Sequence, residues 1–265
     1  TDGIYNLTAR TTDLAGHIMT SPVLETKVDA TAATLIPGTP APDGLNGWHV
    51  TPFDVAAGGS DATSGVAVIE VQLDEGAWAN PVSVNTDGTH ALKFRVTDNA
   101  GNVNLLSNQP VKLDATAPTL VVDESGTAGA WYISPATVTA TGTDATSGLD
   151  RTEMNLDGAT WQATGTMTLS TDGVYSVDAR AYDLAGNVTN APAKTIRVDQ
   201  TPPVLGMRAA GTTGDNGWWV TPLTVISVAY DATSGIKTVD GKLDAGAWAA
   251  ATSVNVTANG ESTVY

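Results

Sequence analysis

Hydrophobic and polar residues alternate along much of the chain, and this period of two is the pattern of half-buried β-strands. In residues 90–97 every second position is His, Leu, Phe or Val, and the positions between carry Ala, Lys, Arg and Thr. The same alternation occurs in residues 5–10, 68–73, 152–156 and 175–180. No segment keeps a 3.6-residue period over several turns. The pattern therefore predicts an all-β chain with almost no helix.

A set of short motifs recurs in the same order along the chain. A Val-Asp or Leu-Asp pair ends at Asp29, Asp114 and Asp199, at intervals of 85 residues. The motifs between these pairs are DATSG (from Asp61, Asp144 and Asp231), a turn ending in Trp78, Trp161 or Trp248, TDG (from Thr1, Thr86 and Thr171) and DxAG (from Asp13, Asp98 and Asp183). They predict a C-terminal part of a repeat at 1–29, complete repeats at 30–114 and 115–199, and a repeat lacking its last two strands at 200–265.

Each complete repeat has room for about seven short strands bounded by Gly, Pro, Asn and Asp, which is the profile of an immunoglobulin-like β-sandwich. We place DATSG between the second and third strands and DxAG between the last two. Tyr5 and Tyr175, just after TDG, stand where a tyrosine corner belongs. His90 replaces this tyrosine in the repeat 30–114, where we expect a weaker corner.

Two cross-strand ion pairs follow from this topology. Glu70 and Glu153 face outward on the third strand of their repeats, and Arg95 and Arg180 face outward on the penultimate strand beside it. We expect pairs Glu70–Arg95 and Glu153–Arg180, each contributing about 0.2–1 kcal/mol.

The ordered set DATSG, LDxGxW, TDGxY, DxAGN and VDxTAP resembles the bacterial Ig-like (Big-type) tandem repeat domains of secreted and cell-surface proteins. The resemblance covers essentially the whole chain. It implies β-sandwiches that serve as spacer, stalk or adhesive modules, often in long arrays, and an extracellular or cell-surface location.

Charge and composition exclude several classes of function. The net charge is −16 with only 12 Lys and Arg, which disfavours nucleic acid and anionic membranes as partners. The chain has no cysteine, so disulfides, thiolate metal sites and thiol catalysis are excluded. No apolar run approaches the roughly 20 residues that a membrane-spanning helix needs, and we expect no membrane insertion. The three histidines fall at non-equivalent positions outside any catalytic constellation, so we expect no enzyme.

The aspartates at the repeat boundaries are the candidate metal ligands. In a sandwich array the linker aspartate of one repeat lies beside the DATSG and DxAG loops of the next. This groups Asp29 with Asp61 and Asp98, Asp114 with Asp144 and Asp183, and Asp199 with Asp231. Carboxylates and backbone carbonyls are the hard oxygen ligands that Ca²⁺ prefers. The alternative is that each Asp only caps a tight turn through hydrogen bonds to its own backbone, and the two roles are compatible.

The tryptophans admit two interpretations. Exposed Trp rings form platforms for sugars, whereas recurrence at the same site in every repeat favours packing, for Trp48, Trp131, Trp218 and Trp219 as for the Trp that follows each LDxG turn. We favour packing.

These patterns predict a non-enzymatic structural segment of a bacterial extracellular fibre, stalk or sheath. The alternative is an adhesin or accessory module that binds glycans or a surface protein.

The segments 1–29 and 200–265 are complementary, so the chain is either an excerpt of a longer array or a subunit that completes its neighbour by strand exchange. The expected partners are adjacent repeats or copies of the chain itself. Because the two segments overlap by about nine residues, we favour the excerpt.

Overall fold

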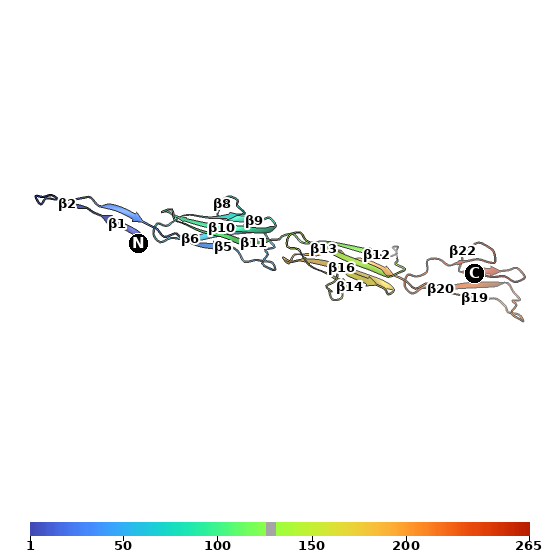
Figure 1. Cartoon of the computed structure of the whole chain (residues 1–265). Helices are drawn as coiled ribbons and strands as arrows, with labels where there is room; N and C mark the ends of the chain where they lie inside the picture. The colour runs from blue at the N-terminus through green and yellow to red at the C-terminus, as the bar shows by residue number, and fades with distance from the viewer. Residues whose placement is uncertain (126–130) are drawn as a thin grey trace. The chain divides into compact units, whose positions relative to one another are not determined.

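The computed structural model describes residues 1–125 and 131–265, and strands make up about 54% of the chain. These described residues contain no helix, as the arrows of Figure 1 illustrate. Accordingly, the described part of the chain offers no helical span for a bilayer. The expected fold class, all-β with immunoglobulin-like repeats, is confirmed.

The chain divides into two compact units. The first comprises Thr1–Leu120, Gly142–Arg151 and Ala181–Thr189. The second comprises Val121–Thr141, Thr152–Arg180 and Asn190–Tyr265. The repeat 30–114 therefore lies entirely within the first unit, together with the loops of the next repeat that contain Asp144 and Asp183.

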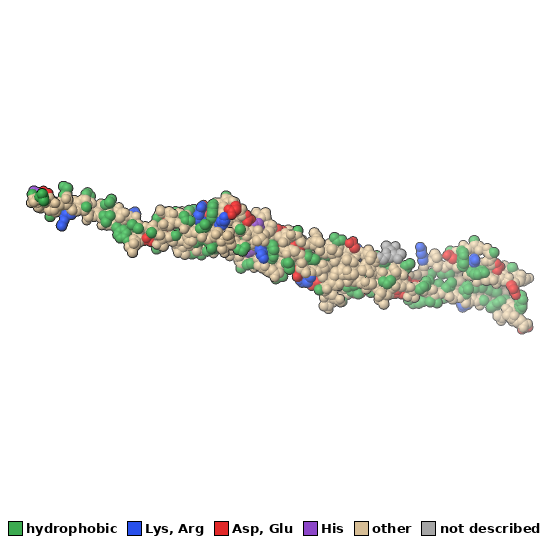
Figure 2. Space-filling view, in the orientation of Figure 1, with side chains coloured by type: hydrophobic (Ala, Val, Ile, Leu, Met, Phe, Trp, Pro, Cys, Tyr) green, Lys and Arg blue, Asp and Glu red, His purple; other side chains and the backbone are tan. Residues whose placement is uncertain are grey.

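The first unit begins with a long hairpin. Strand β1 (Gly3–Leu7) pairs with β4 (Leu24–Val28), and β2 (Arg10–Thr12) pairs with β3 (Ile18–Thr20), all antiparallel. The alternation of its sequence does not lead to burial, because no second sheet covers it in this structure. Ile4, Leu7 and Leu24 stay exposed, and Figure 2 shows hydrophobic side chains along this segment.

Residues 30–114 form a β-sandwich of seven strands. One sheet has the order β5-β6-β9 and the other β11-β10-β7-β8. The strands are β5 (Thr34–Gly38), β6 (Phe53–Ser60), β7 (Val66–Leu73), β8 (Trp78–Ala79), β9 (Val82–Val84), β10 (Gly88–Asp98) and β11 (Val103–Leu113). Val55, Val71, Leu92, Phe94 and Leu113 are fully buried between the sheets. The residues at every second position of the predicted strands thus face the core, and the residues between them face the surface.

The two motif loops lie at one end of this sandwich. Residues 61–65 (DATSG) connect β6 to β7, and residues 99–102 connect β10 to β11. Beyond the opposite end of β5, His49 forms a parallel bridge with Leu113 of β11. His49 N donates to Lys112 O and Asp114 N donates to His49 O, each at 2.8 Å.

The strands from residue 119 onward repeat this scheme. One sheet has the order β12-β13-β15, and β16 pairs with β14 on one side and with β17 and β18 on the other. The strands are β12 (Thr119–Ser125), β13 (Ala136–Thr143), β14 (Leu149–Leu156), β15 (Thr166–Leu169), β16 (Gly173–Asp183), β17 (Val188–Asn190) and β18 (Lys194–Val198). Val138, Met154, Val177 and Ile196 are buried.

Residues 200–265 begin a further sandwich within the second unit. Strands β19 (Val204–Ala210), β20 (Leu223–Tyr230) and β23 (Ser253–Val256) form one sheet, and β21 (Asp240–Gly241) pairs with β22 (Ala249–Ala250). Lys242 and Tyr265 exchange backbone hydrogen bonds at 3.1 and 3.3 Å, and Asp244 N donates to Thr263 O at 2.8 Å. The segment thus includes the first residues of a penultimate strand, which the sequence pattern had not indicated.

The corner residue differs between repeats as the sequence indicates, but the contact is kept. Tyr175 Oη donates to Thr171 O at 3.0 Å. In the repeat 30–114, His90 Nε2 lies 2.8 Å from Thr86 O, and His90 Nδ1 lies 2.5 Å from Asp74 Oδ2. The imidazole makes the same backbone contact as the tyrosine and adds a carboxylate, so the weaker corner expected at His90 stays a prediction about energy and not about geometry.

Candidate functional site

The predicted aspartate groups come together at the repeat boundaries. Carboxylate oxygens of Asp29, Asp61 and Asp98 lie within 4.8 Å of one another, and the same holds for Asp114, Asp144 and Asp183. Asp98, Asp114 and Asp183 are almost completely buried. The third pair meets at Ser234, whose N–H donates to Asp199 Oδ2 at 3.1 Å and whose hydroxyl lies 3.3 Å from Asp231 Oδ1.

Each loop aspartate caps its own turn. Asp61 Oδ1 accepts the N–H groups of Thr63, Ser64 and Gly65 at 2.8–3.0 Å. Asp98 Oδ1 accepts Asn102 N at 2.8 Å, and Asp98 Oδ2 accepts Asn102 Nδ2 at the same distance. Asp144 and Asp183 make the corresponding bonds in the next repeat. The turn-capping role therefore accounts for these four aspartates without a metal ion.

The linker aspartates are held by the loops of the repeat that follows them. Asp114 Oδ2 accepts Ser147 N at 3.0 Å, and Asn187 Nδ2 donates to Asp114 O at 2.9 Å. Asp29 makes the same two contacts with Ser64 and Asn102, each at 3.1 Å. This arrangement explains why an aspartate recurs at each linker.

A second set of carboxylates holds each linker from the repeat before it. Asp87 of TDG accepts Ala115 N at 2.8 Å and the Thr116 hydroxyl at 2.5 Å. Asp2 binds Ala30 and Thr31, and Asp172 binds Gln200 and Thr201, in the same way. We call these three sets the linker clamps. The sequence analysis missed them, although the joint recurrence of TDG and of Thr two residues after each linker Asp was a usable signal.

Hydrogen bonds favour the ionised form of the clamp residues Asp2 and Asp172 and of the loop residue Asp98. The hydrogen bond from the Thr201 hydroxyl, followed by that from Gln200 N, lowers the pKa of Asp172, and Thr31 and Ala30 lower the pKa of Asp2 similarly. Burial by itself raises the pKa of Asp98, but its hydrogen bonds from Asn102 and neighbouring backbone N–H groups outweigh that effect and the net pKa is lowered.

The clusters have the chemistry of a calcium site. Three carboxylates within one ion's reach, with the linker carbonyl beside them, are hard oxygen ligands, and Ca²⁺ takes six to eight of these. The same carboxylates also accept several N–H donors, which offset part of their mutual repulsion. The residues present therefore fit a cation and also fit a turn without one.

The predicted ion pairs are present, and the arginine of each pair also stacks on a tryptophan ring. Arg95 lies 2.5 Å from Glu70 Oε2, and its guanidinium stacks 4.2 Å from the centre of the Trp78 ring. Arg180 contacts Glu153 at 2.6 Å and Trp161 at 4.0 Å in the next repeat. Packing, the favoured interpretation of these tryptophans, is consistent with one ring face being covered by a guanidinium.

The fold and its junctions define a class of tandem Ig-like sandwiches joined by short, hydrogen-bonded linkers. The family model described as bacterial Ig-like domain matches residues 52–115 and 133–200. Both complete repeats of this chain thus belong to the bacterial Ig-like domain family. No curated protein matches the chain.

Several solved structures are similar at low identity. The fibronectin(III)-like modules of Clostridium thermocellum CbhA are 15% identical, with 62% of this chain and 93% of that chain covered and a TM-score of 0.31. A tetra-tandem repeat from the extending region of a large adhesion protein is 18% identical, covering 100% of this chain and 73% of that one at 0.31. Bacteroides ovatus SGBP-B, from a mixed-linkage glucan utilization locus and in complex with a mixed-linkage heptasaccharide, is 11% identical (90% and 92% covered, 0.23). At these TM-scores the likenesses carry no argument about function.

Proposed function

We propose that this chain is a non-enzymatic structural segment of a bacterial extracellular fibre, stalk or sheath, in which Ig-like repeats set distance and transmit force. The observation that carries the proposal is the double attachment of each linker. A clamp from the preceding repeat and two hydrogen bonds from the following repeat act on the same three residues, Asp114–Thr116. A linker whose backbone and side chains are both occupied has little freedom to act as a hinge.

A bound calcium ion is a second part of the proposal. Ca²⁺ between Asp114, Asp144 and Asp183, and between Asp29, Asp61 and Asp98, would join a linker to both loops of the next repeat. It would add to the hydrogen bonds already made there and would make the junction's stiffness depend on the extracellular calcium concentration.

The alternative role, an adhesin or accessory module for glycans or a surface protein, has less support. A sugar platform needs an accessible aromatic face, and the stacked Arg95 and Arg180 each cover one face of the recurring tryptophan. Quenching of Trp fluorescence by a member of a glycan panel would favour this alternative.

The test of the structural role is the mobility of the junction. Because the chain has no cysteine, Ser107→Cys and Ala163→Cys give a unique pair of spin labels on the two complete repeats. We expect a narrow distance distribution by pulsed electron paramagnetic resonance. The double variant Asp87→Ala with Thr116→Val removes the clamp and should broaden the distribution.

The matched control is Asp123→Asn, which removes an exposed carboxylate of β12 away from the linker and should leave the distribution unchanged. A distribution that is already broad in the unaltered chain would overturn the spacer role, since a freely jointed array cannot set a distance.

A further inference from the structure

Two loops from successive repeats contact each other within the first unit. Leu45 N donates to Ala185 O at 2.7 Å, and Asn46 Nδ2 donates to Leu184 O at 2.8 Å. The Leu45 side chain lies against Gly186, where an added Cβ would come within 3.1 Å of Leu45 Cγ. We call residues 43–48 the acceptor loop and residues 183–187 (Asp-Leu-Ala-Gly-Asn) the tip loop.

The acceptor loop owes its shape to a left-handed Asn-Gly pair. Asn46 and Gly47 have φ of 52° and 78°, and Trp48 N donates to Leu45 O at 3.0 Å. This conformation turns the N–H of Leu45 and the amide of Asn46 outward to the tip loop. Residues of this type are tolerated at positive φ because Gly lacks a Cβ and Asn carries a short polar side chain.

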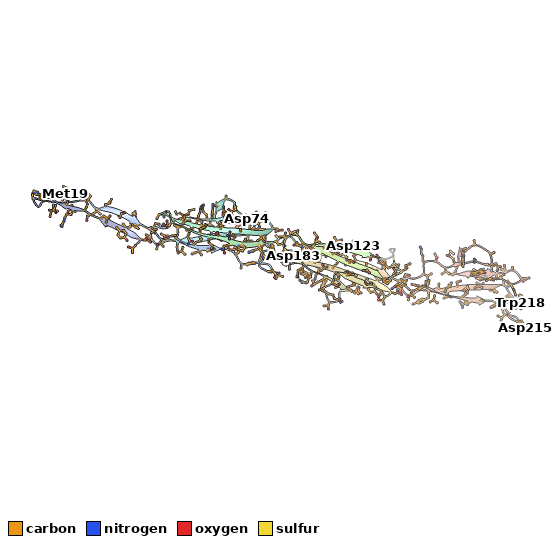
Figure 3. All side chains as sticks on the ribbon, viewed as in Figure 1. Met19, Asp74, Asp123, Asp183, Asp215 and Trp218 are labelled. Carbon is orange, nitrogen blue, oxygen red and sulfur yellow. The ribbon has the colours of Figure 1, made fainter. Side chains whose placement is uncertain are left out.

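A second acceptor loop with the same conformation occurs at residues 213–218. Asn216 and Gly217 have φ of 55° and 82°, and Trp218 N donates to Asp215 O at 3.1 Å. Gly214 N donates to Trp218 O at 2.7 Å, as Gly44 N donates to Trp48 O at 3.0 Å. Trp218 is 55% exposed, and Figure 3 shows it beside Asp215 on this loop.

A second tip loop occurs at residues 13–17 (Asp-Leu-Ala-Gly-His). Gly16 and Gly186 have φ of 92° and 103°, and Asp13 Oδ1 accepts His17 N at 2.8 Å as Asp183 Oδ1 accepts Asn187 N at 2.9 Å. Leu14, the counterpart of Leu184, is fully exposed. This tip is therefore preformed in the shape that the acceptor loop of residues 43–48 binds.

The sequence separates two alternating kinds of repeat. Those with an Asn-Gly-Trp acceptor loop are 30–114 and 200–265, and those with a tyrosine corner and an Asp-Leu-Ala-Gly tip are 1–29 and 115–199. The remaining tip, in the repeat 30–114, has Asn99 in place of the leucine, and the Asn99 amide donates to Ser64 O of its own repeat at 2.8 Å. The tip loop that contacts an acceptor loop is thus the one with the sequence Asp-Leu-Ala-Gly.

We propose that residues 213–218 are a docking surface for the Asp-Leu-Ala-Gly tip of a repeat of the second kind, and that a second copy of this chain supplies it through residues 13–17. Asp215 N and the Asn216 amide donate to the carbonyls of Ala15 and Leu14, as Leu45 and Asn46 do to Ala185 and Leu184. Asp215 stands at the position of Leu45 and His17 at the position of Asn187, and the His17 ring binds Asp13 of its own loop, with Nδ1 2.8 Å from Asp13 Oδ2. This docking is independent of the spacer role, because an adhesin array would use it as well.

The test is disulfide trapping between copies. A backbone hydrogen bond brings two residues within the range that a disulfide needs. Chains carrying Asp215→Cys are mixed with chains carrying Ala15→Cys under mild oxidation. We expect their heterodimer to form about tenfold faster than that of Ala15→Cys with the exposed Ser107→Cys, because docking raises the effective thiol concentration. Adding Asn216→Ala to the Asp215→Cys chain should remove most of this advantage.

The internal reference is Leu45→Cys with Ala185→Cys, which should close within one chain. Equal rates for the Asp215→Cys and Ser107→Cys partners would overturn the proposal. So would faster trapping of Ala15→Cys by Ser234→Cys. That result would mean that the hairpin of the second copy completes the sandwich of residues 200–265 and brings its tip beside Asp231. The linker measurement with spin labels does not depend on any of these outcomes.

Discussion

The position two residues after TDG shows how one contact can be made with different side chains. Tyr175 reaches the backbone of Thr171 with a phenol, and His90 reaches the backbone of Thr86 with an imidazole that also binds Asp74. Burial alone lowers the pKa of His90, but the hydrogen bonds that its ring makes to the Asp74 carboxylate and the Thr86 carbonyl outweigh it, so the net pKa is raised. The net pKa of Asp74 is lowered, since its bonds from His90 and Ala91 outweigh its own burial.

We expect the stability of the sandwich 30–114 to depend on pH through His90. A raised folded-state pKa gives a stabilising contribution that is complete below the unfolded value of about 6.5 and is lost as pH rises through the folded value. The Asp74 contribution is lost in the opposite direction, as pH falls through its lowered value. Burial lowers the pKa of His49 in the same sandwich, which acts in the opposite direction. The His90 contribution is therefore measured by difference: between pH 6 and pH 8, the unaltered chain should lose more stability in denaturant unfolding than His90→Tyr.

The control for this prediction is His90→Tyr, which restores the corner of the other repeats without a group that titrates near neutrality. An unaltered difference between pH 6 and pH 8 in His90→Tyr would show that another group is responsible.

Single residues also mark the limit of prediction from the sequence. The grouping of Asp29 with Asp61 and Asp98 could be predicted because the fold brings loops at one sandwich end together. The contact between Asp87 and Thr116 was missed although both residues recur at fixed positions, because recurrence alone does not give the path of the linker beside the start of β10. The substitution of His90 was visible, but its bond to Asp74 needed the register of β10 against β7.

Strands and loops were more predictable. The alternation in residues 90–97 identified the core positions of β10, and the neighbouring positions of Glu70 and Arg95 followed from the topology. The alternation in residues 5–10 misled in one respect, because burial of Leu7 requires a facing sheet that the hairpin β1–β4 does not have here.

The paired strands β7 and β10 support a measurable coupling. Glu70 and Arg95 are only 22% and 34% exposed, and Trp78 covers the guanidinium. A double-mutant cycle of Glu70→Gln and Arg95→Met should give a coupling energy of about 0.5–1 kcal/mol in denaturant unfolding. Trp78→Leu should reduce that coupling.

The comparison pair for this cycle is Glu75–Lys93 in the same repeat, where the glutamate is 76% exposed. We expect its coupling to be clearly smaller because solvent screens it. A Glu75–Lys93 coupling as large as that of Glu70–Arg95 would contradict the role assigned to the tryptophan.

Calcium binding by the linker and its two loops has a direct thermal test. We expect millimolar Ca²⁺ to raise the melting temperature by about 2–8 °C relative to excess chelator, because an ion that binds only the folded state stabilises it. Asp61→Asn combined with Asp144→Asn should abolish the increase, whereas Asp87→Asn should retain it. Melting that is indifferent to both calcium and chelator would exclude the ion.

At the scale of the whole molecule, the all-β fold and the bacterial Ig-like family of residues 52–115 and 133–200 followed from the sequence. The acceptor loops did not, since only the positive φ of Asn46 and Asn216 reveals that two loops with different neighbours share one shape. Local backbone conformation of this kind is decided by a few residues whose preferences are weak individually.

The parallel bridge between His49 and Leu113 determines where tension passes through a repeat. A pull that enters near Ala33 and leaves at Asp114 crosses from His49 to β11 through two backbone hydrogen bonds. The covalent chain between these points, including the buried core strands β6, β7 and β10, should therefore be extended only after both bonds break. Tyr132 and Val198 form the same parallel bridge in the next repeat. Each of the two complete sandwiches therefore has its own direct path for force between its first and last strands.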